Sequence, residues 1–190
     1  MMLIFAAPFA ALCVYWARRR GGGPSQIAQS DVAWLALPIG SFLLEAAFQA
    51  AFRFVSIPGV LRVVQVLASY TALFAFAARN ARWDWGAIVA GIGAGLNFLV
   101  IAFNGFVMPV SQTALAVAGR EQAIEMLVGG EIYGYGLLTA GTRLPFLADV
   151  IPLLKGRGGY GSVGDVVLVA AAVRVFYAMM LPRGKGRKAV

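Results

Sequence analysis

Three polar side chains share one face of a long apolar segment, where charge is costly. Glu45, Gln49 and Arg53 are spaced four residues apart, so a helix would stack them on one side. An ionised side chain at the bilayer centre costs about 2.5–3.5 kcal/mol on insertion scales, and such residues often mark ion or ligand pathways. We interpret Glu45 as a candidate proton or ligand site. The alternative is a structural ion pair with Arg62 or Arg174.

Two asparagines and two glycines occupy a second apolar segment. Asn97 and Asn104 are seven residues apart and would lie on one helix face, where their amides could hold a polar ligand or join neighbouring helices. Gly91 and Gly95 form a small-xxx-small pattern, which favours close helix packing. We do not interpret these glycines as a dinucleotide site, because no strand precedes them.

A buried arginine needs an acidic partner, and the sequence offers three. Arg174 lies midway along the last apolar segment, and Glu45, Asp149 and Asp165 are its candidate partners. Asp165 also has capping-box spacing to Ser162 at the start of that segment. Asp149 lies between two prolines on broken apolar backbone, which is tolerated at membrane depth only inside protein or beside water.

Several kinds of chemistry are excluded by residue type. The sequence contains no histidine and one cysteine, Cys13, so an internal disulfide, a zinc site with histidine ligands and a Ser-His-Asp triad are ruled out. We expect no metal, no cofactor and no assigned catalytic residue. Paired carboxylates can share acid and base roles, so Asp149 and Asp165 leave an enzyme open as an alternative.

The composition favours a lipid environment over water. Of the 190 residues 61% are hydrophobic and 13% are charged, compared with roughly a quarter charged in soluble domains. We predict an all-α fold: a polytopic membrane helical bundle in a single domain, 1–190. It would have about five transmembrane helices, at 1–17, 32–54, 60–77, 83–103 and 162–181.

The region between the last two predicted spans differs from the rest. Residues 104–160 are polar or amphipathic, and we predict an interfacial helix at 112–128 and a short broken or re-entrant helix at 144–154. At about 1.5 Å per residue the second piece is too short to cross a core of roughly 30 Å.

Basic residues cluster beside the apolar segments, at Arg18–Arg20, at Arg79 and Arg82, and in the tail 182–190. Five spans would place all three clusters on one side, as the positive-inside rule requires. We therefore predict a multi-pass protein of the cell (inner or plasma) membrane with its N-terminus outside and its C-terminus cytoplasmic. Clusters placed in this way indicate topology rather than nucleic-acid binding.

Part of the sequence resembles a known family. Residues 97–111, NFLVIAFNGFVMPVS, are followed by Leu147-Ala148-Asp149 and by Ser162-Val163-Gly164-Asp165. In this pattern the chain resembles an uncharacterised family of bacterial multi-spanning membrane proteins, a domain of unknown function. The resemblance implies a shared fold and a shared polar cluster at Asn97, Asn104, Asp149 and Asp165. It implies no activity.

Three functions are consistent with these features. The first is a binding or accessory module that docks a membrane partner or a lipid. The second is a small proton-coupled transporter using Glu45, and the third is an enzyme on a lipid-linked substrate using Asp149 and Asp165. The expected partners are the lipid bilayer, another membrane protein or a second copy of the chain, and a lipid or small-molecule ligand. We favour the first function and no enzyme activity.

Overall fold

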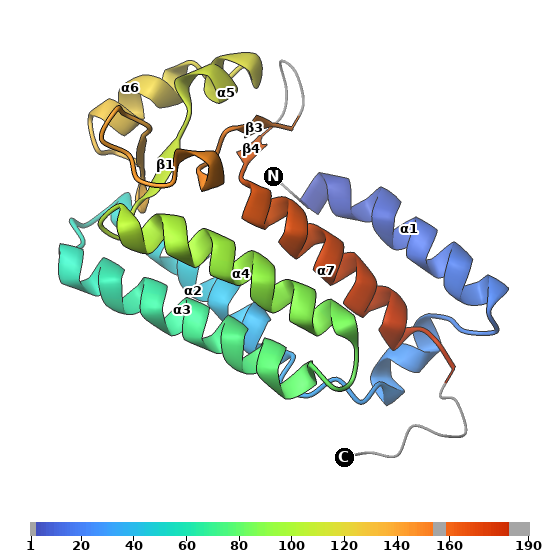
Figure 1. The fold of residues 1–190 in the computed structure, drawn as a ribbon. Coiled ribbons are helices and arrows are strands. Elements are labelled where there is room, and N and C mark those ends of the chain that lie inside the picture. Colours follow the sequence, from blue (N-terminus) through green and yellow to red (C-terminus); the bar gives the residue numbers. More distant parts are fainter. Residues whose placement is uncertain (1–2, 154–158, 183–190) are drawn as a thin grey trace.

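The computed structural model describes residues 3–153 and 159–182, and its main body is a bundle of long helices (Figure 1). Within these residues the long helices are α1 (Leu3–Arg19), α2 (Ala36–Phe52), α3 (Gly59–Asn80), α4 (Trp85–Phe103) and α7 (Val163–Met179). Successive helices run in alternating directions, and a short 3-10 helix, η1 (Pro24–Gln29), connects α1 to α2.

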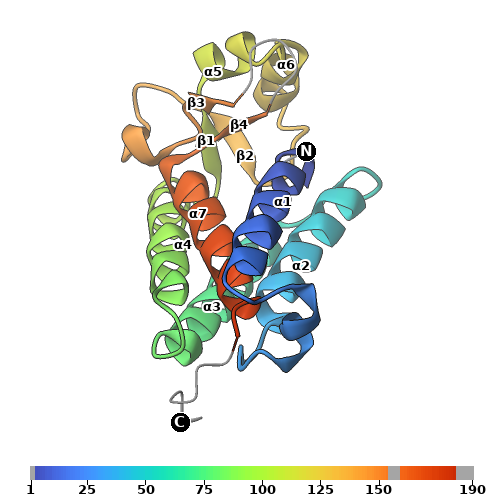
Figure 2. The same ribbon diagram turned by 90° about the vertical axis from the view of Figure 1, so that its right-hand side faces the viewer.

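A small mixed layer covers the end of the bundle at which α4 ends and α7 begins (Figures 1 and 2). We call residues 104–161 the cap and this end of the bundle the cap end; the other is the basal end. The described cap contains β1 (Met108–Val110), α5 (Gln112–Val117), α6 (Gln122–Val128), β2 (Tyr135–Leu137), the 3-10 turn η2 (Pro145–Leu147), β3 (Ile151–Pro152) and β4 (Tyr160–Gly161). Strands β1 and β2 pair in parallel, and β3 and β4 pair antiparallel.

The closest packing in the bundle joins α4 to α7. A Cβ atom added at Gly164 of α7 would lie 2.9 Å from the carbonyl oxygen of Gly93 of α4, so the two backbones approach as only glycines allow. Gly91 and Gly95 lie on another side of α4 and face α3. Helix α2 packs along α3, and α1 packs along α7.

The second apolar segment becomes helical later than predicted, at Ala36 rather than near residue 32. The cause is a long-range hydrogen-bonded pair. Asn80, at the end of α3, accepts a bond from the Ala33 N–H at 2.9 Å and donates one to the Ala33 carbonyl at 2.9 Å. These bonds hold residue 33 in a non-helical conformation.

The single interfacial helix predicted at 112–128 is wrong, because the chain breaks it into α5 and α6. Gly119 has a positive φ of 70°, and the Arg120 N–H bonds back to the Leu115 carbonyl at 2.8 Å. The Gly119 N–H bonds to the Ala116 carbonyl at 3.0 Å. This pair of bonds is the Schellman motif, which ends a helix.

The broken helix predicted at 144–154 is also wrong, and the prediction of an all-α fold fails in this region. Residues 145–147 form a 3-10 turn, followed by β3. The Asp149 N–H donates to the Pro109 carbonyl at 2.9 Å, and the Ser111 N–H donates to the Asp149 carbonyl at 3.0 Å. Two prolines remove donors that a helix would use, so the segment pairs with the end of β1 instead.

Two of the described helices, α3 and α4, are long and apolar enough to cross a membrane. Helices α1, α2 and α7 have 17 residues each, or about 26 Å at 1.5 Å per residue, which is at the lower limit for a span. Apart from Pro182, the predicted basic tail 182–190 lies outside the described residues.

Candidate functional site

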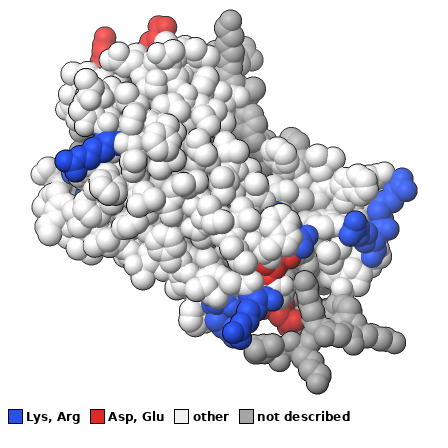
Figure 3. Space-filling model, viewed as in Figure 1, with Lys and Arg blue, Asp and Glu red and all other residues white. Residues whose placement is uncertain are grey.

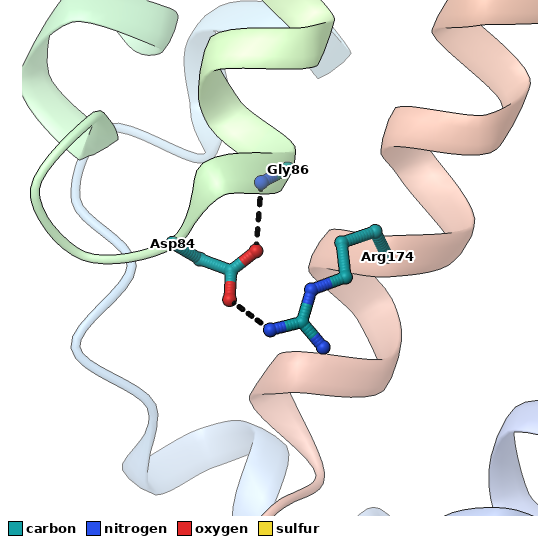
Figure 4. A network of polar contacts seen from close by, with 3 residues as sticks. All are labelled: Asp84, Gly86 and Arg174. Carbon is teal, nitrogen blue, oxygen red and sulfur yellow. Dashed lines mark hydrogen bonds and ion pairs between the residues drawn. The ribbon is translucent and has the colours of Figure 1, made fainter.

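The polar side chains singled out in the sequence lie in two separate places. At the basal end Arg174 pairs with Asp84, with 2.5 Å between Nη2 and Oδ2 (Figure 4). The other Asp84 oxygen accepts the Gly86 N–H at 2.8 Å, so Asp84 also caps α4. The Arg174 guanidinium lies over the rings of Trp85 and Tyr177, 5.0 and 5.8 Å from their centroids.

This pairing corrects the partners predicted for Arg174. Glu45, Asp149 and Asp165 all lie away from it, and the sequence analysis missed Asp84. A local signal was present, because an aspartate directly before an apolar helix is a common N-cap. Antiparallel packing of α4 and α7 then brings the start of α4 beside the second half of α7.

A hydrogen-bonded network at the cap end joins α4 to the start of α7. Asn97 donates to Asp165 Oδ1 at 2.8 Å and accepts from the Ser162 hydroxyl at 2.7 Å. The predicted capping box is present, since Asp165 Oδ2 accepts the Ser162 N–H and Ser162 Oγ accepts the Asp165 N–H, both at 3.0 Å. Both Asp165 oxygens therefore accept hydrogen bonds, which accounts for a structural role of this residue.

Asn104 does not belong to this network. Its amide nitrogen donates to the carbonyls of Val100 and Arg143, at 2.7 and 2.8 Å, and its oxygen accepts the Arg143 N–H at 2.9 Å. The side chain thus ties the cap to the end of α4. It also borders a cleft of about 260 Å³ in the cap, lined by Val107, Pro109, Gly136, Leu137, Thr139, Gly141 and Thr142.

Asp149 is the most unusual acid in the described structure. Its residue is 4% exposed, and its Oδ1 atom has no hydrogen-bond partner. Burial, with a smaller contribution from the carboxylates of Asp165 and Glu45, raises its pKa from 3.8 to about 8. The backbone bonds to Pro109 and Ser111 hold the main chain of residue 149 against the end of β1.

Glu45 completes an acidic group under the cap. Its side chain accepts one hydrogen bond, from Gln49 at 3.2 Å, and within the described chain it forms no ion pair with Arg62 or any other basic residue. Glu45 is exposed on α2, and it interacts electrostatically with both Asp165 and Asp149. We call Glu45, Asp149 and Asp165 the acidic cluster.

Tyrosines from the cap and from α3 interact electrostatically with members of the acidic cluster. Tyr133 is 6% exposed, its hydroxyl has no partner, and its ring packs against Phe48 and Phe52 of α2 at centroid distances of 5.7 and 5.5 Å. This contact places Tyr133 one turn beyond Glu45, with which it interacts electrostatically. Burial raises the pKa of Tyr135, and Glu45 and Asp149 raise it further.

Tyr70 of α3 interacts with all three acids of the cluster. The sequence analysis missed these tyrosines, because aromatic residues near a predicted boundary are typical interface anchors. Across the described ranges, no group of three or more His, Cys, Asp or Glu side chains converges closely enough to hold a metal ion.

The fold and the site together define a helical-bundle protein with two helices able to cross a membrane and an acidic cluster beneath a mixed cap. The chain belongs to a family of unknown function, DUF5317, whose model matches residues 29–179. This confirms the family resemblance, and the match extends through α2 and α3, beyond the motifs that suggested it. Neither the curated proteins nor the solved structures searched gave a match.

Proposed function

We propose that the protein is a five-span membrane protein that works as a ligand-binding module. Surface chemistry supports the spans. Only 28% of the most apolar stretch of α3 and 33% of that of α4 is buried, whereas a core helix of a soluble protein would be mostly buried. Large apolar side chains face outward along the bundle, among them Phe42 at 63% and Ile92 at 55% exposure.

The distribution of charge supports an outward cap. Basic residues end α1 and α3 at the basal end. Figure 3 shows acidic side chains at the top of the cap and a basic side chain near the cap end, and at the basal end it shows basic side chains together with acidic ones. By the positive-inside rule the basal end would face the cytoplasm. Helix α1 begins near the cap end in both ribbon views (Figures 1 and 2), which agrees with an external N-terminus.

One observation carries the binding role: the buried, unpartnered Oδ1 of Asp149 beside two further carboxylates. A buried polar atom without a partner costs about 1–3 kcal/mol, so a fold that keeps one invites a ligand to satisfy it. The same geometry disfavours an enzyme with Asp149 and Asp165 as acid and base. Both Asp165 oxygens already serve the helix cap and Asn97.

Topology is tested by labelling single cysteines from outside intact cells. In a Cys13→Ser background, Glu131→Cys on the cap and Arg19→Cys at the basal end are both exposed positions. A membrane-impermeant maleimide should label the cap position alone. Labelling of the basal position alone, or of both, would overturn the proposed orientation.

The binding role is tested by native mass spectrometry after gentle extraction from the membrane. We expect the wild-type protein to retain a stoichiometric lipid, small molecule or membrane-protein partner, and we expect Asp149→Asn to lose it. A bare wild-type monomer would contradict the proposal.

A further inference from the structure

We propose that two copies of the chain pair through α2, with Gln49 of each copy hydrogen-bonded to Gln49 of the other. This inference rests on the membrane spans proposed above, and it goes beyond the binding role of the cap end by naming a partner. Three features of α2 support it: an uncovered side, the spacing of its polar residues and their unused hydrogen-bonding groups.

Helix α2 lies at the margin of the bundle (Figure 2), and among the long helices of the described chain it packs closely along α3 alone. Ser41 marks the side toward α3, because its hydroxyl donates to the Ser69 carbonyl at 3.1 Å. It is also the one buried residue of the helix. Away from α3 the helix exposes large apolar side chains, with Phe42 at 63% exposure. One side of α2 is therefore uncovered in a single copy of the described chain.

The uncovered side carries two polar residues at the spacing of a helix pair. Phe42, Glu45 and Gln49 follow one another at intervals of three and four residues, and all three are exposed. We call these three residues the α2 stripe. The same intervals occur along the contact line of paired helices. Lipid chains offer no hydrogen bond to a carboxyl or an amide, so a polar partner would stabilise the stripe in a membrane.

The amide of Gln49 is complementary to a second copy of itself. Its nitrogen donates one hydrogen bond, to Glu45 Oε1 at 3.2 Å, and Glu45 thereby positions the amide. An amide has a second N–H donor and an acceptor oxygen, and neither has a partner within the described residues. Two such amides can bond reciprocally across a two-fold axis, as single polar residues at contact positions do in coiled coils.

Membrane insertion sets the direction of this pairing. All copies of a membrane protein have the same orientation, so α2 of one copy runs parallel to α2 of the next and equal residues meet at equal depth. The two Glu45 carboxyls then face each other as well, and one proton on either of them supplies a hydrogen bond to the other. A second copy thus provides the matching groups from this sequence itself.

Cysteine crosslinking in intact membranes tests the contact. In a Cys13→Ser background, Phe42→Cys places a thiol on the α2 stripe. Leu43→Cys is the matched control, because it lies at the same depth, is 60% exposed and points about 100° away around the helix. Copper phenanthroline should link Phe42→Cys into a covalent pair of two chains and leave Leu43→Cys monomeric. Equal linking at both positions, linking to a different protein, or no linking at all would overturn the proposal.

Single-molecule photobleaching in liposomes measures the affinity of the pair over a range of protein-to-lipid ratios. Gln49→Leu removes the amide and makes α2 more apolar, so insertion in the membrane is retained. We expect it to weaken pairing at least about tenfold, because two reciprocal hydrogen bonds are lost. Glu45→Gln keeps a donor and an acceptor and should pair within a few-fold of wild type. Ile92→Ala, at an exposed position of α4, should have no effect. Unchanged pairing in Gln49→Leu would refute the role assigned to the amide.

The outcomes separate this inference from the proposed function. Asp149→Asn, which changes the cap, should still crosslink at position 42. Outward labelling of the cap without crosslinking would refute the pairing and leave the membrane topology standing. Labelling of the basal position from outside would instead overturn the orientation and leave the crosslinking result to stand by itself.

Discussion

The basal end and the cap end of the bundle differ in how their charged side chains are paired. At the basal end Arg174 forms an ion pair with Asp84, and the aspartate also caps α4, although the Nε atom of Arg174 is buried without a hydrogen-bond partner. At the cap end Asp149 is buried with one oxygen unpartnered, and Glu45 has a single amide contact. An acid paired with a base is typical of structural sites, whereas a buried acid without a basic partner and with a raised pKa is enriched at functional ones. The contrast agrees with a structural role for the basal end and with the binding role proposed for the cap end.

The largest loss of stability should follow from pushing α4 and α7 apart where they pack beside the cap-end hydrogen-bonded network. In Gly164→Ala the new Cβ would lie 2.0 Å from Asn97 Oδ1 and 2.9 Å from the Gly93 carbonyl oxygen. We expect a loss of about 3 kcal/mol or more, or failure to fold. Gly40→Ala is the control, since nothing lies within 4 Å of its added Cβ, and it should be neutral or stabilising. Equal melting temperatures of Gly164→Ala and wild type would mean that α4 and α7 pack less closely than described.

The next largest effect should come from breaking the basal ion pair. Asp84→Asn leaves Arg174 without its counter-charge. Because the Arg174 side chain is 22% exposed, we expect a loss of about 2 kcal/mol, less than the 3–5 of a fully buried pair. Chemical denaturation in detergent measures it. The double variant Asp84→Asn/Arg174→Met should recover part of the loss. If Asp84→Asn lost no more stability than Asp149→Asn at pH 7, the two ends would not differ in their contribution to stability.

The effect of Asp149→Asn on stability should depend strongly on pH. The pKa of Asp149 is about 8 in the folded protein against 3.8 ordinarily, so the folded state holds an extra proton between these values. Stability therefore falls as pH rises through that window. We expect the melting temperature of wild type minus that of Asp149→Asn to decrease from pH 5 to pH 8.5. A flat difference would mean that the carboxyl is not shielded from water.

The smallest effect on stability should come from Glu45→Gln. Its position is exposed and its one contact, to Gln49, is kept by an amide, so we expect a change within about 0.5 kcal/mol. Thermal unfolding measures this. A large destabilisation would show that Glu45 holds the bundle together, and the cap end would then resemble the basal end.

Local features were well predicted from the sequence. The capping box of Ser162 and Asp165 was foreseen because its hydrogen bonds span three residues, and the approximate positions of the long helices followed from apolar runs. The breaks in the cap were not foreseen. Gly119 ends α5. The segment 144–154 does not form a helix despite its apolar composition, because the backbone of residue 149 pairs with the end of β1.

The sequence by itself determined the helical bundle, the apolar surface and the chemical types available, since these depend on composition and on short-range spacing. It singled out Glu45, Asp149 and Asp165 as separate candidates. Only the tertiary structure decided that they interact electrostatically, that Tyr133 packs against the helix that carries Glu45, and that Arg174 pairs with a residue 90 positions away. Long-range pairing depends on how helices pack and align, and no local pattern encodes that arrangement.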